Sequence, residues 1–222
     1  MSEFEGQTVV VTGVAGALGE VVANTFHQAK ARVIGIDILA TAAAFQTLIA
    51  DLTDLNGAKL AVAEIGEIHV LANIAGGFAM GESVAETLDD TWDFMFNLNA
   101  RTVLNMARAV VPNMQKQGHG RIINIGARAG LQGAGNMSAY CASKSVVMRL
   151  TESLADELKA SGINVNCILP SIINTERNRL DMPEADFSTW VKPDEIANVA
   201  MFLASDAASA IHGALLPVEG LA

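Results

Sequence analysis

Short runs of β-branched and other apolar residues alternate with helix-length segments along almost all of this 222-residue chain. Strands that are buried on both faces of a parallel sheet read as continuous apolar runs, and each needs a crossover before the next strand. The alternation therefore predicts an α/β fold: one domain over residues 1–222, with a doubly wound parallel sheet and helices on both faces. The predicted strands are residues 8–13, 31–37, 67–76, 121–126, 163–170 and 214–218.

Three longer segments have the apolar spacing of helices, namely residues 86–116, 138–160 and 193–203. Hydrophobic residues make up 51% of the chain and charged residues only 17%. This composition leaves apolar surface to bury in a core or between subunits. We therefore expect a homo-oligomer.

The charge balance narrows the class of partner. A formal net charge of −10 without any Lys/Arg cluster argues against nucleic acid and leaves a small-molecule substrate as the expected partner. No uncharged run has the length and apolarity of a membrane span, and the acidic first residues do not resemble a secretory signal. Cys141 and Cys167 fit neither a disulfide framework nor a metal cluster, so we expect a cytoplasmic setting. No metal site is expected either, because the four histidines are scattered without ligand spacing: His27, His69, His119 and His212.

A glycine-rich turn follows the first predicted strand and leads directly into a helix. Glycines permit a tight turn there and let backbone N–H groups approach a pyrophosphate at the helix N-terminus. Asp37 ends the second strand, where a carboxylate can bind both adenosine ribose hydroxyls and repel a 2′-phosphate. We predict NAD(H) in preference to NADP(H). The alternative for the glycines is an ordinary connection between a strand and a helix, and the alternative for Asp37 is a surface acid or a helix N-cap. The residues of this predicted turn are Gly13, Gly16, Ala17, Leu18 and Gly19.

Two further predicted strands end in segments that suit the same site, because ligands of open α/β sheets lie beyond the carboxyl ends of the strands. Asp51 and Leu52 are expected at the adenine, and the turn with Asn73, Ala75 and Gly76 is expected beside the ribose. Taken alone, either segment would be an ordinary loop.

Tyr140 is the only tyrosine of the chain, and Lys144 stands four residues after it. Positions i and i+4 lie one turn apart on the same face of a helix, so the phenol and the ammonium can point into one site. A neighbouring positive charge would lower the pKa of the phenol and make it a better acid or base. The alternative is an amphipathic tyrosine beside an exposed lysine.

Together with Asn99 and the "PSIINT" turn at 170–175, these motifs resemble the short-chain dehydrogenase/reductase family over essentially the whole chain. The resemblance implies a single-domain Rossmann fold and an NAD(P)-dependent oxidoreductase. It implies Tyr140 as the proton donor and Lys144 as its partner and ribose ligand. Asn99 would hold a water that relays protons to Lys144; a polar residue that bonds the backbone is the alternative. The same resemblance places Pro170, Ile173 and Thr175 at the nicotinamide.

The sequence departs from the family at Ala127, thirteen residues before Tyr140, where the substrate-binding serine usually stands. Alanine cannot donate a hydrogen bond to a developing alkoxide, and one such donor is commonly worth ~10² to 10³ in rate. The dihydropteridine reductase branch resembles this chain in Gly126-Ala127-Arg128, in "AGGF" at 75–78 and in the stretch 178–190. That resemblance implies a quinonoid acceptor at Ala127, with Phe78 covering its flat ring. Residues 174–190 contain Pro183 and mixed charges, and we expect them to form a lid over the substrate; a plain surface loop is the alternative.

Three functional hypotheses follow. The first is an NADH-dependent reductase of the dihydropteridine reductase type. The second is a carbonyl or 3-oxoacyl-type reductase or alcohol dehydrogenase, in which another donor such as Asn136 replaces the serine. The third is a nucleotide-binding sensor without turnover.

Overall fold

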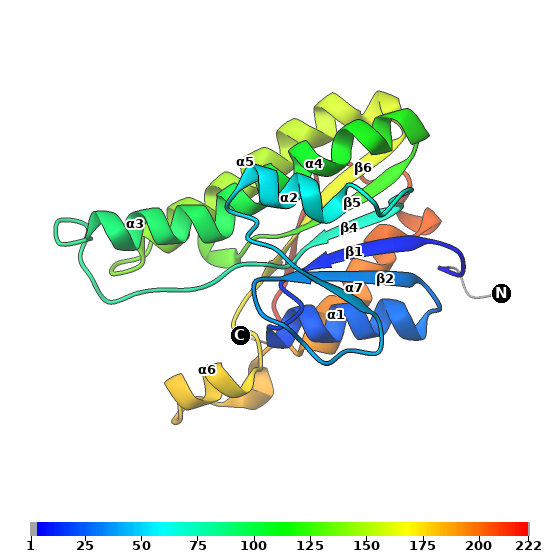
Figure 1. Cartoon of the computed structure of the whole chain (residues 1–222). Helices are drawn as coiled ribbons and strands as arrows, with labels where there is room; N and C mark the ends of the chain where they lie inside the picture. Colours follow the sequence, from blue (N-terminus) through cyan, green and yellow to red (C-terminus); the bar gives the residue numbers. More distant parts are fainter. Residues whose placement is uncertain (1–3, 222) are drawn as a thin grey trace.

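The fold is built on seven parallel strands, as a computed structural model that describes residues 4–221 shows. Their order across the sheet is β3-β2-β1-β4-β5-β6-β7 (Figure 1). Strands β2 and β3 are added on one side of β1, and β4 to β7 on the other, so the direction in which successive strands are added reverses between β1 and β4. This reversal point is where doubly wound sheets bind their ligands. The strands are β1 Thr8–Thr12, β2 Arg32–Asp37, β3 Gln46–Ile49, β4 Val70–Asn73, β5 Gly120–Ile125, β6 Ile163–Pro170 and β7 Leu215–Val218.

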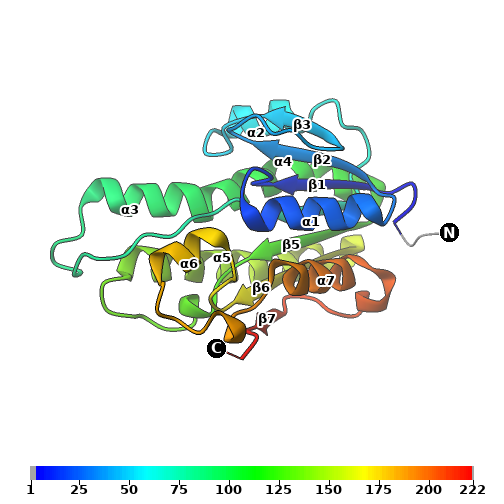
Figure 2. The same cartoon turned by 90° about the horizontal axis from the view of Figure 1, so that it is seen from below.

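Helices cover both faces of the sheet, as predicted. One face carries α1 (Ala17–Gln28) and α7 (Pro193–Ala204), which lie side by side in Figure 2. The other face carries α2 (Leu55–Val62), α4 (Thr102–Gln117) and α5 (Ser138–Leu158). Two short helices, α3 (Asp89–Phe96) and α6 (Glu176–Asp181), project beyond the sheet. None of the helices within residues 4–221 combines the length and apolar character that a membrane crossing needs.

The residues of β1 show why the apolar runs become two-sided strands. Val9 and Val11 pack into the core beneath α1 and α7, whereas Val10 packs into the core beneath α2 and α4. All five residues of β1 are buried. Because successive side chains of a strand point to opposite faces, an uninterrupted apolar run is what two covered faces require.

The structure corrects three of the predicted elements. β3 was not predicted, because Gln46–Ile49 is a partly exposed edge strand without an apolar run. The predicted helix 86–116 is divided: α3 begins at Asp89, and a π-helical turn at Asn97–Arg101 separates it from α4. α6 lies within the segment predicted as a lid. The ends of the predicted domain, residues 1–3 and 222, lie outside the described residues.

Candidate active site

The glycine-rich turn between β1 and α1 tolerates no side chain at two of its positions. Gly13 has φ +74°, and a Cβ there would lie 2.7 Å from the Cα of Ala75. A Cβ on Gly19 would lie 2.0 Å from the carbonyl oxygen of Gly13. Gly16 caps α1, whose first turn contains Ala17 and Leu18. The first N–H groups of a helix have no partner within the helix, so this close turn presents donors to an anion such as a pyrophosphate.

Asp37 lies beside this turn, as predicted. Its Oδ2 accepts the backbone N–H of Ala15 at 2.9 Å, and its Oδ1 accepts that of Leu39 at 3.1 Å. Each carboxylate oxygen retains a second lone pair. The carboxylate is therefore held at the end of β2 with acceptors left for the two hydroxyls of a ribose.

The residues that follow the next strands lie at the same edge of the sheet, and the place of Asn73 at the cofactor stays a prediction. Asp51 is exposed and Leu52 is buried just after β3. The side chain of Asn73 does not face the site, because its amide donates to Asn124 Oδ1 at 2.9 Å in the protein interior. Thr12, which sequence reasoning missed, instead joins the two strand ends by accepting the N–H groups of Ile74 and Ala75. Only the backbone of Asn73 can line the predicted cofactor site.

Gly76 lies directly against the candidate catalytic residues. A Cβ at this position would be 2.9 Å from Asn99 Oδ1 and 3.2 Å from Lys144 Nζ. Any side chain would therefore displace one of these two groups. The glycine brings a strand-end backbone into contact with the ammonium.

The π-helical turn places Asn99 inside the protein, where it is only 1% exposed. Its Oδ1 accepts the N–H of Gly77 at 2.9 Å, and its amide donates to the Gly77 carbonyl at 3.1 Å and to Ser143 Oγ at 3.0 Å. Ser143 in turn donates to the Tyr140 carbonyl at 2.8 Å. Both amide N–H groups of Asn99 are thus used within the protein, as in the alternative interpretation, and the proton relay stays a prediction. Sequence reasoning missed Ser143; its only signal was a hydroxyl at helical spacing from Tyr140.

Tyr140 and Lys144 lie one turn apart on α5, but the pKa of Tyr140 is not lowered as expected. Burial raises the pKa of the phenol to about 12, and the Cys141 thiol adds to this shift. Burial also lowers the pKa of Lys144 to about 8. The Lys144 ammonium donates to the Ile125 carbonyl at 2.9 Å, at the end of β5. In the protein alone, desolvation of the phenol therefore outweighs any attraction by the ammonium.

Phe78 stands beside the candidate proton donor. Its ring meets that of Tyr140 edge-on, with centroids 4.8 Å apart and an interplanar angle of 83°. The Phe78 side chain is 54% exposed. An aromatic ring with one face in solvent beside the phenol can cover a flat ligand.

Ala127 is buried, in extended backbone at the end of β5. The turn that follows it packs on α5, where Ser145 Oγ donates to the Gly130 carbonyl at 2.5 Å. Arg128 forms an ion pair with Glu219, with its Nε 2.9 Å from Oε1. The position that usually carries a serine thus presents a buried methyl group.

The turn after β6 leads from Pro170 into α6. Ile173 forms a single parallel bridge with Val191, and Thr175 caps α6 by accepting the N–H of Asn178 at 3.2 Å. These residues follow a strand at the same edge of the sheet as the glycine turn, so their predicted place at the nicotinamide is geometrically consistent.

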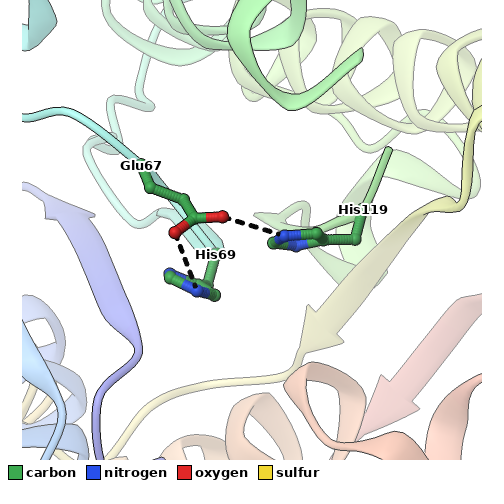
Figure 3. Close-up of side chains that lie close together, drawn as sticks. All are labelled: Glu67, His69 and His119. Carbon is green, nitrogen blue, oxygen red and sulfur yellow. Dashed lines mark hydrogen bonds and ion pairs between the residues drawn. The ribbon is translucent and has the colours of Figure 1, made fainter. Parts of the chain in front are cut away.

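Two of the histidines are not scattered, contrary to expectation, and meet at the opposite end of the sheet (Figure 3). Glu67 lies 3.1 Å from His119 Nε2 and 3.8 Å from His69 Nε2. His69 Nδ1 accepts the N–H of Thr8 at 3.0 Å, which leaves the ring proton on Nε2. A metal would need that atom free of its proton, so the three groups do not fit a metal site.

A glycine-rich turn at the reversal point of a parallel sheet, together with a partly buried tyrosine and a buried lysine one helical turn apart, defines a dinucleotide-dependent oxidoreductase. The chain belongs to the short-chain dehydrogenase/reductase family, since residues 7–185 match the "short chain dehydrogenase" family profile. It is 32% identical to 2-dehydro-3-deoxy-D-gluconate 5-dehydrogenase of Dickeya dadantii, over 98% of this chain and 95% of that one. It is 33% identical to 3-oxoacyl-(acyl-carrier-protein) reductase FabG of Escherichia coli, over 98% and 97%. A solved gluconate 5-dehydrogenase from Burkholderia cenocepacia, in complex with NADP and tartrate, superposes with a TM-score of 0.90 at 28% identity. That superposition covers 99% of this chain and 96% of the solved one.

Proposed function

We propose that this oxidoreductase reduces an electron-poor conjugated acceptor, with a quinonoid dihydropterin as the candidate substrate. The observation that carries the proposal is the buried methyl group of Ala127, two residues after the Ile125 carbonyl that accepts a hydrogen bond from the Lys144 ammonium. A ketone needs a donor at its oxygen as the alkoxide develops, whereas a quinonoid ring is already a strong acceptor. The exposed face of Phe78 beside Tyr140 suits a flat ring of this kind.

The protonation state of Tyr140 is compatible with a role as proton donor in a reduction. With a pKa of about 12, Tyr140 keeps its proton at neutral pH and so serves as an acid. Lys144, with a pKa of about 8, is mostly charged at pH 7 and can stabilise the phenolate that forms when the proton leaves. A nicotinamide cofactor would supply the hydride, held by Gly13, Gly16 and Gly19 at its pyrophosphate.

We propose NADH as the preferred reductant, on the charge of Asp37. Two backbone N–H groups fix its carboxylate beside the glycine turn, where it would repel the 2′-phosphate of NADPH. Asp37→Ser should lower KM for NADPH and raise KM for NADH, each by about tenfold. An unchanged ratio of the two KM values would contradict the preference. The solved gluconate 5-dehydrogenase holds NADP, so the test bears directly on how this chain differs.

The decisive experiment is NADH oxidation with a panel of quinonoid dihydropterins, quinones and ketones. Tyr140→Phe should abolish turnover while leaving NADH affinity nearly unchanged; retained turnover would refute the role of the phenol. Ala127→Ser should change quinonoid turnover by less than about twofold, since that acceptor needs no added donor. Binding of NADH without oxidation across the panel would favour a nucleotide sensor.

A carbonyl or 3-oxoacyl-type reductase is the second candidate, supported by the names of the relatives. Asn136 is its replacement donor, in a turn that leads into Tyr140. For this function Ala127→Ser should raise ketone turnover ~10²-fold, because it restores an oxyanion donor. The two candidates are thus separated by one substitution.

We propose that residues 174–190 act as a lid over the substrate. Asn174 ties the segment together, donating to the Phe187 carbonyl at 3.1 Å and accepting from Arg179 Nε at 2.6 Å. These bonds join α6 to the far end of the segment. The lid would therefore move as one unit rather than as a loose loop.

We also infer a homodimer or homotetramer in a cytoplasmic setting. α3 exposes apolar side chains that a subunit contact would cover, with Trp92 43% and Phe94 57% exposed. Cys141 and Cys167 are both free and buried, which suits a reducing compartment. Sedimentation of the purified protein tests the assembly; a monomer at micromolar concentration would exclude it.

A further inference from the structure

A small pocket is lined by residues that follow Phe78 and precede Tyr140 in the chain. It has a volume of about 150 Å³ and lies between residues 79–82, which follow Phe78, and residues 136–139, which lead into Tyr140. The Gly81 N–H joins these two segments by donating to the Asn136 carbonyl at 2.9 Å. A substrate held against the Tyr140 and Phe78 rings would thus have this pocket beside it.

The walls of the pocket carry neutral hydrogen-bonding groups. Thr87, Thr91 and Ser138 contribute hydroxyls and Asn136 contributes an amide. The Thr87 hydroxyl donates to the Ser83 carbonyl at 2.9 Å, so Ser138 Oγ, which lies 3.3 Å from Thr87 Oγ1, is the donor of this pair. Both oxygens keep a lone pair for a ligand. Such acceptors recognise the hydroxyls of a ligand, which donate to them.

The charge of the pocket disfavours an anion. Glu82 is its one charged lining residue, and no lysine or arginine lines it. The Glu82 carboxylate accepts the Leu88 N–H at 3.3 Å, which holds it at the rim. A carboxylate or phosphate on the ligand would meet a like charge without a compensating cation.

The backbone and the size of the pocket restrict the ligand further. Asn136 has φ +61°, which is uncommon for a residue other than glycine and is a feature of functional turns. The pocket volume of about 150 Å³ lies below the range of about 300–1,000 Å³ that is typical of pockets for drug-sized ligands. The pocket thus suits a short side chain of the substrate rather than the whole substrate.

We propose that this pocket binds a short, neutral, hydroxylated side chain of the acceptor, a vicinal diol or triol. The ring or carbonyl to be reduced would lie against Tyr140 and Phe78 at the same time. The inference deepens the proposed function and rests on it for the reducible group. It separates this chain from enzymes whose substrates place a carboxylate or phosphate in this position.

The experiment compares two pairs of acceptors with the full-length protein and NADH. Each pair differs only in the hydroxylated chain: quinonoid 6-(1,2-dihydroxypropyl)dihydropterin against its 6-methyl analogue, and a neutral trihydroxy ketone against its deoxy analogue. We expect kcat/KM to favour the hydroxylated member of at least one pair by ~10- to 100-fold. Thr87→Val with Ser138→Ala should bring that ratio near one. Ser83→Ala, which removes a hydroxyl just outside the pocket, is the matched control and should leave the ratio unchanged.

The outcomes separate the two proposals. Both pterins reduced at equal kcat/KM, without hydroxyl preference among the ketones, would overturn the pocket assignment and leave the proposed function standing. Ketones reduced with the preference, while neither pterin reacts, would support the pocket and refute the quinonoid acceptor. Absence of a hydroxyl preference in both pairs, inactivity included, overturns the inference. Glu82→Gln gives an independent readout: it should improve kcat/KM for a carboxylate-bearing analogue by about tenfold.

Discussion

Lys144→Met tests the cost of the buried ammonium in the candidate site. Burial lowers the pKa of Lys144 from 10.5 to about 8, and each pKa unit corresponds to about 1.4 kcal/mol. The charged lysine therefore destabilises the folded protein by about 3 kcal/mol at pH 7. Methionine keeps an unbranched side chain of similar length. It loses the hydrogen bond to the Ile125 carbonyl, which is a contribution of about 1 kcal/mol and the same at every pH.

The sign of the pH dependence follows from the two pKa values. The pKa of Lys144 is lower in the folded protein than in the unfolded chain, so the unfolded chain binds the proton more tightly. Proton binding therefore favours the unfolded state, and this effect decreases as pH rises from 8 toward 10.5, so the folded wild type becomes more stable. Wild type should therefore gain about 2 kcal/mol relative to Lys144→Met between pH 7 and pH 10. At pH 7 the variant should be inactive yet at least as stable as wild type.

Urea unfolding followed by tryptophan fluorescence measures this difference, because Trp190 is buried. Lys59→Met is the matched control, since Lys59 is exposed on α2. Its effect on unfolding should be the same at pH 7 and pH 10. If the difference between wild type and Lys144→Met also stays constant over this range, the ammonium is not desolvated and the reasoning is refuted.

Three further substitutions have definite expected outcomes. Gly76→Ala should reduce kcat ~10²-fold, because its Cβ would lie 3.2 Å from Lys144 Nζ and displace it; unchanged kcat would contradict the contact. Gly19→Ala should abolish NADH binding in calorimetry, because its Cβ would lie 2.0 Å from the Gly13 oxygen; normal binding would contradict the tight turn. His69→Asn should flatten the loss of stability in acid. Burial lowers the pKa of His69 in the folded protein, so the wild-type histidine stabilises the fold above about pH 6.5 and loses this contribution as pH falls. Equal acid sensitivity of both proteins in thermal unfolding would exclude that role.

The sequence predicted the buried strands because short apolar runs that alternate with helix-length segments indicate parallel strands covered on both faces. It did not predict β3, whose edge position leaves Gln46 and Ile49 exposed. It also did not predict the contact between His69 and His119, which are fifty residues apart. β4 and β5 are neighbours that start in register, so the residues before them meet. Pairing of distant strand ends is a property of topology, not of local pattern.

The candidate site shows the same limit. The spacing of Tyr140 and Lys144 predicted one helix face, and the structure has them on α5. The direction of the Asn73 side chain could not be predicted, because it depends on which face of β4 each residue takes at the strand end. The pKa of Tyr140 could not be predicted from a neighbouring lysine alone. Desolvation is set by the whole surrounding fold, and here it raises the pKa of the phenol to about 12.

The π-helical turn at Asn97–Arg101 connects α3 to α4 without a break and changes the rotation of one helix relative to the other about their common axis. A π turn holds one residue more than an α-helix needs, and one residue corresponds to a rotation of about 100°. Deletion of a single residue here would restore regular helix geometry, but it would rotate the outward face of α3 relative to α4. The exposed Trp92 face and the buried Asn99 are therefore set by the same extra residue. The exposed side of α3 and the buried Asn99 therefore cannot vary independently, so a one-residue deletion should alter the exposed apolar face of α3 and turnover together.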